Sequence, residues 1–155
     1  METKLLTQPE IKFIGIEVQT TNQKEMDPST AKIPGLWGRF FQEKIAEKIP
    51  DKKHDGPLFG IYTKYESDHT GPYSLIIGVE VNDLESTPVG MTGLTIPPGQ
   101  FMVFTAQGPM PNALIDTWIY IWDYFSKETR HKRLYTADYE VHSGNDNVDI
   151  YIAVN

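Results

Sequence analysis

Glu140 is the residue in this sequence that is the best candidate for a functional side chain. It lies between Tyr139 and Val141 in a β-rich segment, which a turn at residues 143–146 joins to a second β-rich segment. Glycine and asparagine in that turn favour left-handed backbone, so the two segments are predicted to form a hairpin. A carboxylate beneath aromatic rings attracts organic cations by its charge, and the ring faces attract the same cations through their quadrupoles.

Other chemistries lack the residues or the spacing that they need. The four histidines show no spacing typical of metal ligands, and the glycines form no phosphate-binding loop. The sequence has no cysteine, which excludes thiolate metal sites and cysteine nucleophiles, and no serine lies in a nucleophile elbow. We therefore expect no metal, no cofactor and no catalytic residues.

Composition and charge narrow the class of protein. A length of 155 residues suits one domain with its own core, and the absence of cysteine fits a reducing compartment. Neither a signal peptide nor a membrane-spanning run is present, so a cytoplasmic protein without a membrane partner is expected. The formal net charge of -7 repels phosphate backbones, so we expect no direct binding to nucleic acid.

The elements that must position Glu140 follow from hydrophobic periodicity. Apolar residues at helical spacing predict one helix over 34–49, between two prolines, and another over 114–125. Runs rich in β-branched and aromatic residues predict strands at 11–18, 58–65, 73–81, 91–96, 99–107, 134–142 and 148–154.

The order of these elements repeats once along the chain. We predict an α+β fold over residues 1–155, in which two βαββ units, at about 9–82 and 90–155, are related by a pseudo-twofold axis. The two units would share one curved antiparallel sheet with two helices. A shift of 75 residues places Ile77 on Ile152, in agreement with such a repeat.

The surroundings of Glu140 stay open at this level. A shift of 77 residues between the halves places Thr63 on Glu140, so a charge stands where the other half has a small neutral residue. Strict alternation, however, groups Glu140 with Thr136, Asp138 and His142, which is typical of a solvated face. The residues alone permit a carboxylate in a pocket or one in water.

A resemblance to a known family rests on the order of several segments, 35–41, 59–62, 77–81, 98–104, 118–122, 138–140 and 148–154. In this order they resemble the GyrI-like small-molecule-binding superfamily, the effector-binding domain of AraC-type and MerR-type multidrug regulators, and especially its stand-alone bacterial and integron-cassette forms. The resemblance covers residues 9–155. The resemblance implies a saddle of antiparallel strands with a central cleft for lipophilic, often cationic, compounds. It also implies that Glu140 is the acidic ligand contact.

Aromatic residues near this cleft are the candidate walls. Besides Glu140, we predict ligand-binding roles for Trp37, Phe40, Tyr62, Phe104 and Trp118. Each of these residue types is equally suited to an ordinary core position.

The expected function is that of a stand-alone binding module for lipophilic, cationic small molecules, not an enzyme. The domain pattern begins near the first residue, so we expect no helix-turn-helix, and any regulatory output would pass through a separate regulator or target protein. One alternative is a small-molecule hydrolase that uses Glu140 as a general base on water. Another is a protein-binding inhibitor, similar to the gyrase-inhibiting members of the superfamily.

Overall fold

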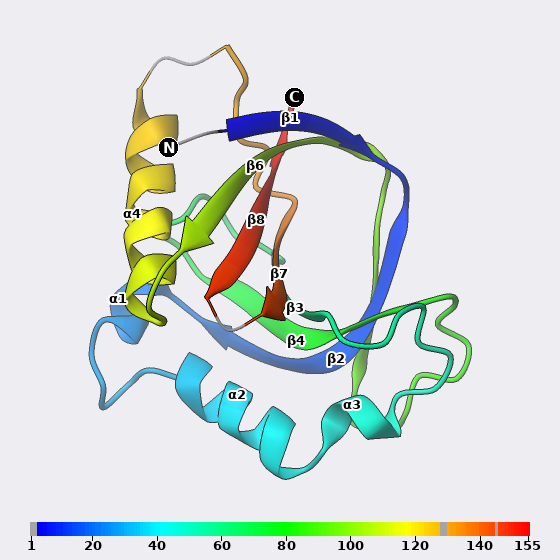
Figure 1. Cartoon of the computed structure of the whole chain (residues 1–155). Coiled ribbons are helices and arrows are strands. Elements are labelled where there is room, and N and C mark those ends of the chain that lie inside the picture. Colours follow the sequence, from blue (N-terminus) through cyan, green and yellow to red (C-terminus); the bar gives the residue numbers. More distant parts are fainter. Residues whose placement is uncertain (1–2, 128–129, 145) are drawn as a thin grey trace.

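The structure is a computed structural model that describes residues 3–127, 130–144 and 146–155. In this part of the chain, strands form one antiparallel sheet in the order β1-β6-β8-β7-β3-β4-β2-β5 (Figure 1). Together with the helices, this sheet confirms the predicted α+β fold. The strands are β1 (Thr3–Gln8), β2 (Ile11–Thr20), β3 (Leu58–Thr63), β4 (Tyr73–Val81), β5 (Thr92–Ile96), β6 (Gly99–Gln107), β7 (Ala137–Gly144) and β8 (Asn147–Val154). The helices are α1 (Asn22–Glu25), α2 (Ile33–Gln42), α3 (Ile45–Lys48) and α4 (Asn112–Ser126).

The strand order contains the predicted repeat and adds an exchange between its halves. β3 and β7 pair at the centre, β4 and β2 extend the sheet on one side, and β8 and β6 extend it on the other. At the edges, β1, which lies just before the first half, pairs with β6, and β5 of the second half pairs with β2. Each half of the sheet is therefore completed by a strand that is adjacent in sequence to the other half. This supports our proposal of one domain over 1–155, with halves at about 9–82 and 90–155.

The register between the halves differs by one residue from the prediction for β3 and β7. Tyr62 pairs with Leu75 in the first half, and Glu140 pairs with Ile150 in the second. Leu75 and Ile150 are related by the predicted shift of 75 residues, so the counterpart of Glu140 is Tyr62 rather than Thr63. A one-residue error matters because it moves a side chain to the opposite face of the sheet.

Some local elements also differ from the sequence pattern. β1 and α1 are not predicted: β1 is an edge strand with exposed or half-buried side chains, and so it lacks an apolar alternation. The predicted helix over 34–49 is divided, because Lys44 adopts a left-handed conformation (φ 51°) that ends α2. β7 begins at Ala137 instead of 134, and Asn145 of the predicted turn lies outside the described residues. None of the described helices is long and apolar enough to cross a membrane.

The two long helices cover the same face of the sheet but leave its centre open. Leu36 and Phe40 of α2 pack against β2 and β4, and Ile121 of α4 packs against β6 and β8. The central strands β3 and β7 lie between these two packed regions. The site described below therefore forms where the pseudo-twofold axis passes through the sheet.

On the opposite face the curved sheet packs against itself. Phe13 of β2 and Phe101 of β6 both contact Tyr139 of β7, at ring-centroid distances of 5.8 and 5.5 Å. Strands β2 and β6 themselves are far apart in the strand order of the sheet. Gly15 and Gly78 face each other between β2 and β4, and a Cβ on either would lie 2.0–2.1 Å from a backbone oxygen of the other strand. The glycine pair thus permits the close approach that the curvature requires.

Candidate ligand-binding site

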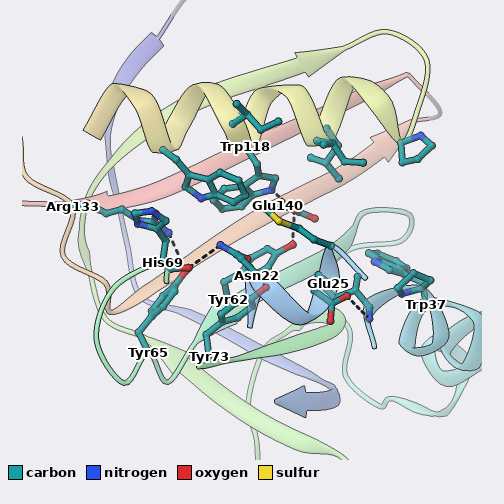
Figure 2. A pocket seen from close by; sticks show the side chains of 18 residues that line it. Asn22, Glu25, Trp37, Tyr62, Tyr65, His69, Tyr73, Trp118, Arg133 and Glu140 are labelled. Carbon is teal, nitrogen blue, oxygen red and sulfur yellow. Dashed lines mark hydrogen bonds between the residues drawn. The ribbon is translucent and has the colours of Figure 1, made fainter. Parts of the chain in front are cut away.

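A cavity of about 700 Å³ lies over β3 and β7, between α2 and α4. Figure 2 shows Trp118, Tyr62 and Glu140 in its middle, with Arg133, Tyr65 and His69 toward one end and Trp37 and Glu25 toward the other. We call it the central cavity. It is lined by Asn22, Glu25, Met26, Ile33, Pro34, Trp37, Tyr62, Tyr65, His69, Tyr73, Pro111, Leu114, Ile115, Trp118, Ile119, Trp122, Arg133 and Glu140.

Glu140 is a buried carboxylate in the wall of this cavity. Its side chain is 2% exposed, and Oε2 accepts hydrogen bonds from the Tyr62 hydroxyl (2.9 Å) and from Nε1 of Trp118 (2.7 Å). Nε2 of His142 lies 2.8 Å from Oε1. The interpretation of this strand face as solvated is therefore wrong, because Glu140 and Asp138 are both buried.

The neighbouring strand leaves room for this carboxylate. Gly60 of β3 pairs with Glu140 of β7, and a Cβ at Gly60 would lie 3.1 Å from Oε1. Alanine at position 60 would therefore make a tight contact, and the carboxylate would have to shift slightly to relieve it. Glycine at this central position thus lets β3 and β7 stay paired while a charged side chain lies across them.

The tyrosine hydroxyl beside Glu140 is a permanent donor at neutral pH. Burial raises the pKa of Tyr62 well above its usual value, and the negative charge of Glu140 raises it further. The same two causes, burial and then the charges of Glu25 and Glu140, raise the pKa of Tyr73. Both phenols therefore remain protonated, and Tyr62 helps to hold Glu140 in one orientation.

Aromatic rings surround the carboxylate. The Trp118 ring meets the Tyr62 ring edge-on, with centroids 5.0 Å apart. The Trp122 ring lies one turn along α4, and its centroid is 6.4 Å from that of Trp118. On the α2 side, the Trp37 ring contacts the His142 ring at 4.9 Å. The carboxylate of Glu140 thus lies among aromatic rings contributed by β3, α2 and α4.

A second charged cluster lies at one end of the cavity. Asp138 is fully buried, and it accepts hydrogen bonds from Nη2 of Arg133 (2.8 Å), the Tyr65 hydroxyl (2.7 Å) and the backbone N–H of Ala153 (2.8 Å). Burial disfavours the charged form of Arg133, but attraction to Asp138 outweighs it and the pKa of Arg133 is raised. Burial and then the charge of Asp138 also raise the pKa of Tyr65. The guanidinium and its carboxylate therefore form a persistent ion pair.

Glu25 has a structural task at the other end of the cavity. Its carboxylate accepts the backbone N–H of Lys32 (2.9 Å) and of Ile33 (3.0 Å), at the start of α2. Lys32, the N-cap residue, makes no side-chain capping hydrogen bond of its own. Glu25 thus satisfies backbone donors that a helix leaves free at its first turn, and it fixes the position of α2 over the cavity.

Replacement of Glu25 by alanine should lower the free energy of unfolding by about 1–2 kcal/mol, because the first N–H groups of α2 lose their acceptor. Urea denaturation monitored by circular dichroism would measure this loss. A matched control is Glu43→Ala, since Glu43 is exposed and pairs with Arg39 one helical turn away. That change should cost less than about 0.5 kcal/mol. Equal losses in the two variants would contradict the capping role.

The structure brings together four of the six predicted site residues. Trp37, Tyr62, Trp118 and Glu140 line the central cavity, but Phe40 and Phe104 do not. Phe40 is 2% exposed and packs in the core between α2 and the strands β2 and β4. Phe104 is fully buried beneath α4, where its ring contacts Tyr120, Tyr124 and Phe125. The prediction that these two phenylalanines line the cleft is wrong.

Three further residues at the site could not be assigned to it from the sequence pattern. His142 follows Glu140 by two residues, so alternation places it on the same face, but its approach to the carboxylate is a matter of packing. Tyr65 would point away from the face of Tyr62, yet Lys64 between them is left-handed (φ 53°) and returns Tyr65 to the cavity. Arg133 lies in a charged loop, where no periodicity distinguishes it from its neighbours.

The comparison with protein families gives one match over nearly the whole chain. The profile of the integron-associated effector-binding protein family, Cass2, matches residues 4–154. No curated protein matches the sequence significantly.

Solved structures share the fold. An integron cassette protein from the mobile metagenome of Vibrio cholerae is 34% identical, with a TM-score of 0.84 over 99% of this chain and 95% of that one. SAV2435, whose structure contains tetraphenylphosphonium, is 20% identical, with a TM-score of 0.79 over 100% and 94%. The C-terminal domain of EcmrR is 16% identical, with a TM-score of 0.67 over 99% and 97%. The predicted resemblance is confirmed by the family match and by these folds.

Proposed function

The chain belongs to the integron-associated effector-binding protein family, and we propose that it binds lipophilic, cationic small molecules in the central cavity. The observation that carries the proposal is the buried carboxylate of Glu140 among aromatic rings. A cavity of about 700 Å³ is within the range of drug-sized ligand sites. The structure of SAV2435, a protein of the same fold, bound to tetraphenylphosphonium, a lipophilic cation, is consistent with this class of ligand.

The charge balance of the site favours a cation over an anion. Within the described part of the chain, the ion-pair partner of Glu140 is His142, which carries charge only when protonated, and no lysine or arginine pairs with it. The other buried carboxylate, Asp138, is already neutralised by Arg133. An organic cation would therefore supply the positive charge that the environment of Glu140 lacks, while the net charge of -7 concentrates cations near the surface.

Binding without turnover is the activity that this geometry favours. Oε2 of Glu140 already accepts two hydrogen bonds, and Nε2 of His142 lies 2.8 Å from Oε1, so these three neighbours compete with a water molecule for the carboxylate. The hydrolase alternative would need this carboxylate as its base. For regulation, the same negative net charge disfavours contact with nucleic acid, so we propose that any output passes through a separate protein.

Calorimetric titration with tetraphenylphosphonium should give saturable binding, and a permanently cationic ester incubated overnight should be recovered unchanged. Mass spectrometry of the recovered compound would detect hydrolysis products. Heat release without any saturable phase would contradict the binding proposal. Products that form with wild-type protein and disappear with Glu140→Gln would instead support the hydrolase with Glu140 as base.

A further inference from the structure

Besides Glu25 and Glu140, Arg133 is a charged side chain in the wall of the central cavity, and its hydrogen bonds are incomplete. Its side chain is 3% exposed, and Nη2 donates to Asp138 (2.8 Å) and to the Tyr65 hydroxyl (3.1 Å). Nε and Nη1 are buried and have no hydrogen-bond partner among the described residues. Buried donors on a charged group are costly to leave unpaired, so these two nitrogens are strong candidates to donate to an acceptor brought by a ligand.

Aromatic rings lie around the guanidinium, and its two unpaired nitrogens are buried among the neighbouring side chains. Its central carbon lies 4.5 Å from the Tyr135 ring centroid, 5.6 Å from Tyr65 and 5.8 Å from Trp118. Figure 2 shows Arg133 at the end of the cavity away from Trp37, beyond Trp118 and Glu140. A ligand that pairs with Glu140 and extends toward this end would meet the guanidinium after a small rotation of a ring side chain, a common adjustment on binding.

The charge state of the cluster decides which acceptor suits it. Asp138 neutralises Arg133 and lies 2.8 Å from Nη2, so a second anion would meet repulsion from that carboxylate. A neutral carbonyl oxygen accepts from N–H groups without this penalty. The cluster therefore discriminates between acceptors by their charge.

We propose that the central cavity is built for lipophilic cations that also carry a neutral carbonyl oxygen, and that Nε and Nη1 of Arg133 bind this oxygen. The inference rests on the proposed function, because the cation is placed by Glu140. It adds a second recognition point, which makes the site selective among cations of similar size.

Three dyes with the same xanthylium cation separate the two recognition points. Tetramethylrosamine carries a plain phenyl ring, tetramethylrhodamine methyl ester adds a neutral carbonyl, and tetramethylrhodamine adds a carboxylate. Fluorescence anisotropy titrations should show the ester binding about tenfold more tightly than the rosamine, the scale of one hydrogen bond to a charged group. The carboxylate dye should bind no more tightly than the ester.

The matched variant is Arg133→Met combined with Asp138→Asn, which removes both charges and leaves neither partner buried alone. In this double variant, the advantage of the ester over the rosamine should fall to within about twofold. A direct readout is also available, because the chain has three arginines and hence three Nε–H signals in a ¹⁵N–¹H spectrum. The signal missing from the double variant should shift on addition of the ester and much less on addition of the rosamine.

The dye titrations distinguish failure of the Arg133 contact from failure of cation binding. The Arg133 contact would be overturned, with cation binding left intact, if wild-type protein bound ester and rosamine equally. It would also be overturned if the advantage of the ester persisted in the double variant. Tightest binding of the carboxylate dye would overturn the neutral acceptor. If wild-type protein binds none of the three dyes, both the inference and the proposed function fail.

Discussion

Replacement of Asp138 by alanine should lower the free energy of unfolding by about 3–5 kcal/mol, because it leaves the Arg133 guanidinium buried without its counter-ion. The same change removes the acceptor for the Tyr65 hydroxyl and for the backbone N–H of Ala153. Urea denaturation followed by circular dichroism and by tryptophan fluorescence would measure the loss. The large effect follows from burial, since Asp138 is fully buried and Arg133 is 3% exposed.

Two controls separate the charge from the hydrogen bonds. Asp123→Ala removes an exposed carboxylate that pairs with Lys127, so it should cost less than about 0.5 kcal/mol. The combination Asp138→Asn with Arg133→Met should recover most of the stability lost in Asp138→Ala, because no charge remains buried alone. A loss for Asp138→Ala as small as that for Asp123→Ala would show that the buried ion pair contributes little to the folded state.

Replacement of Glu140 by glutamine should weaken the binding of a permanent cation by about 1–3 kcal/mol, by removing the charge that pairs with it. The amide oxygen of glutamine can still accept from Tyr62 and Trp118, so the shape of the cavity should be kept. The natural pair of probes is 10-methylacridinium and neutral acridine, measured by calorimetry at weakly alkaline pH, where acridine is unprotonated and the acridinium ring has not added hydroxide. The variant should lose affinity for the first and keep it for the second.

The pattern of losses assigns the role of Glu140. Equal losses for 10-methylacridinium and acridine would mean that Glu140 supports the cavity wall without recognising charge. Equal affinities in wild type and variant would mean that the cation is held by the rings alone. The melting temperature of unliganded Glu140→Gln should be compared with wild type, so that a folding defect is not mistaken for a loss of recognition.

Most of the secondary structure could be predicted because its signals are local. Alternation and apolar runs marked the strands from β2 to β8, and helical spacing marked α2 and α4. The exchange of β1 and β5 between the halves could not be predicted, since edge strands carry little apolar pattern and their partners lie far away in the sequence.

The lining of the central cavity was predicted only in part. Among the aromatic candidates, Trp37 and Phe40 lie one helical turn apart, yet Trp37 lines the cavity while Phe40 enters the core. Periodicity places both on the apolar side of α2, and only the position of the helix over the sheet separates their surroundings. The same limit applies to Phe104, whose strand carries α4 above it.

The sequence by itself determined the fold class, the two-unit repeat and the choice of Glu140 as the acidic residue of interest. Tertiary structure alone decided that Glu140 is buried, because alternation says which residues share a face and not what covers that face. It also brought Arg133, Tyr65 and Asp138 together, since Tyr65 is separated from the other two by about seventy residues of chain and is turned toward them by the left-handed Lys64. Charged and polar residues are solvated by default, so only packing of the whole sheet could place these three at one end of the central cavity.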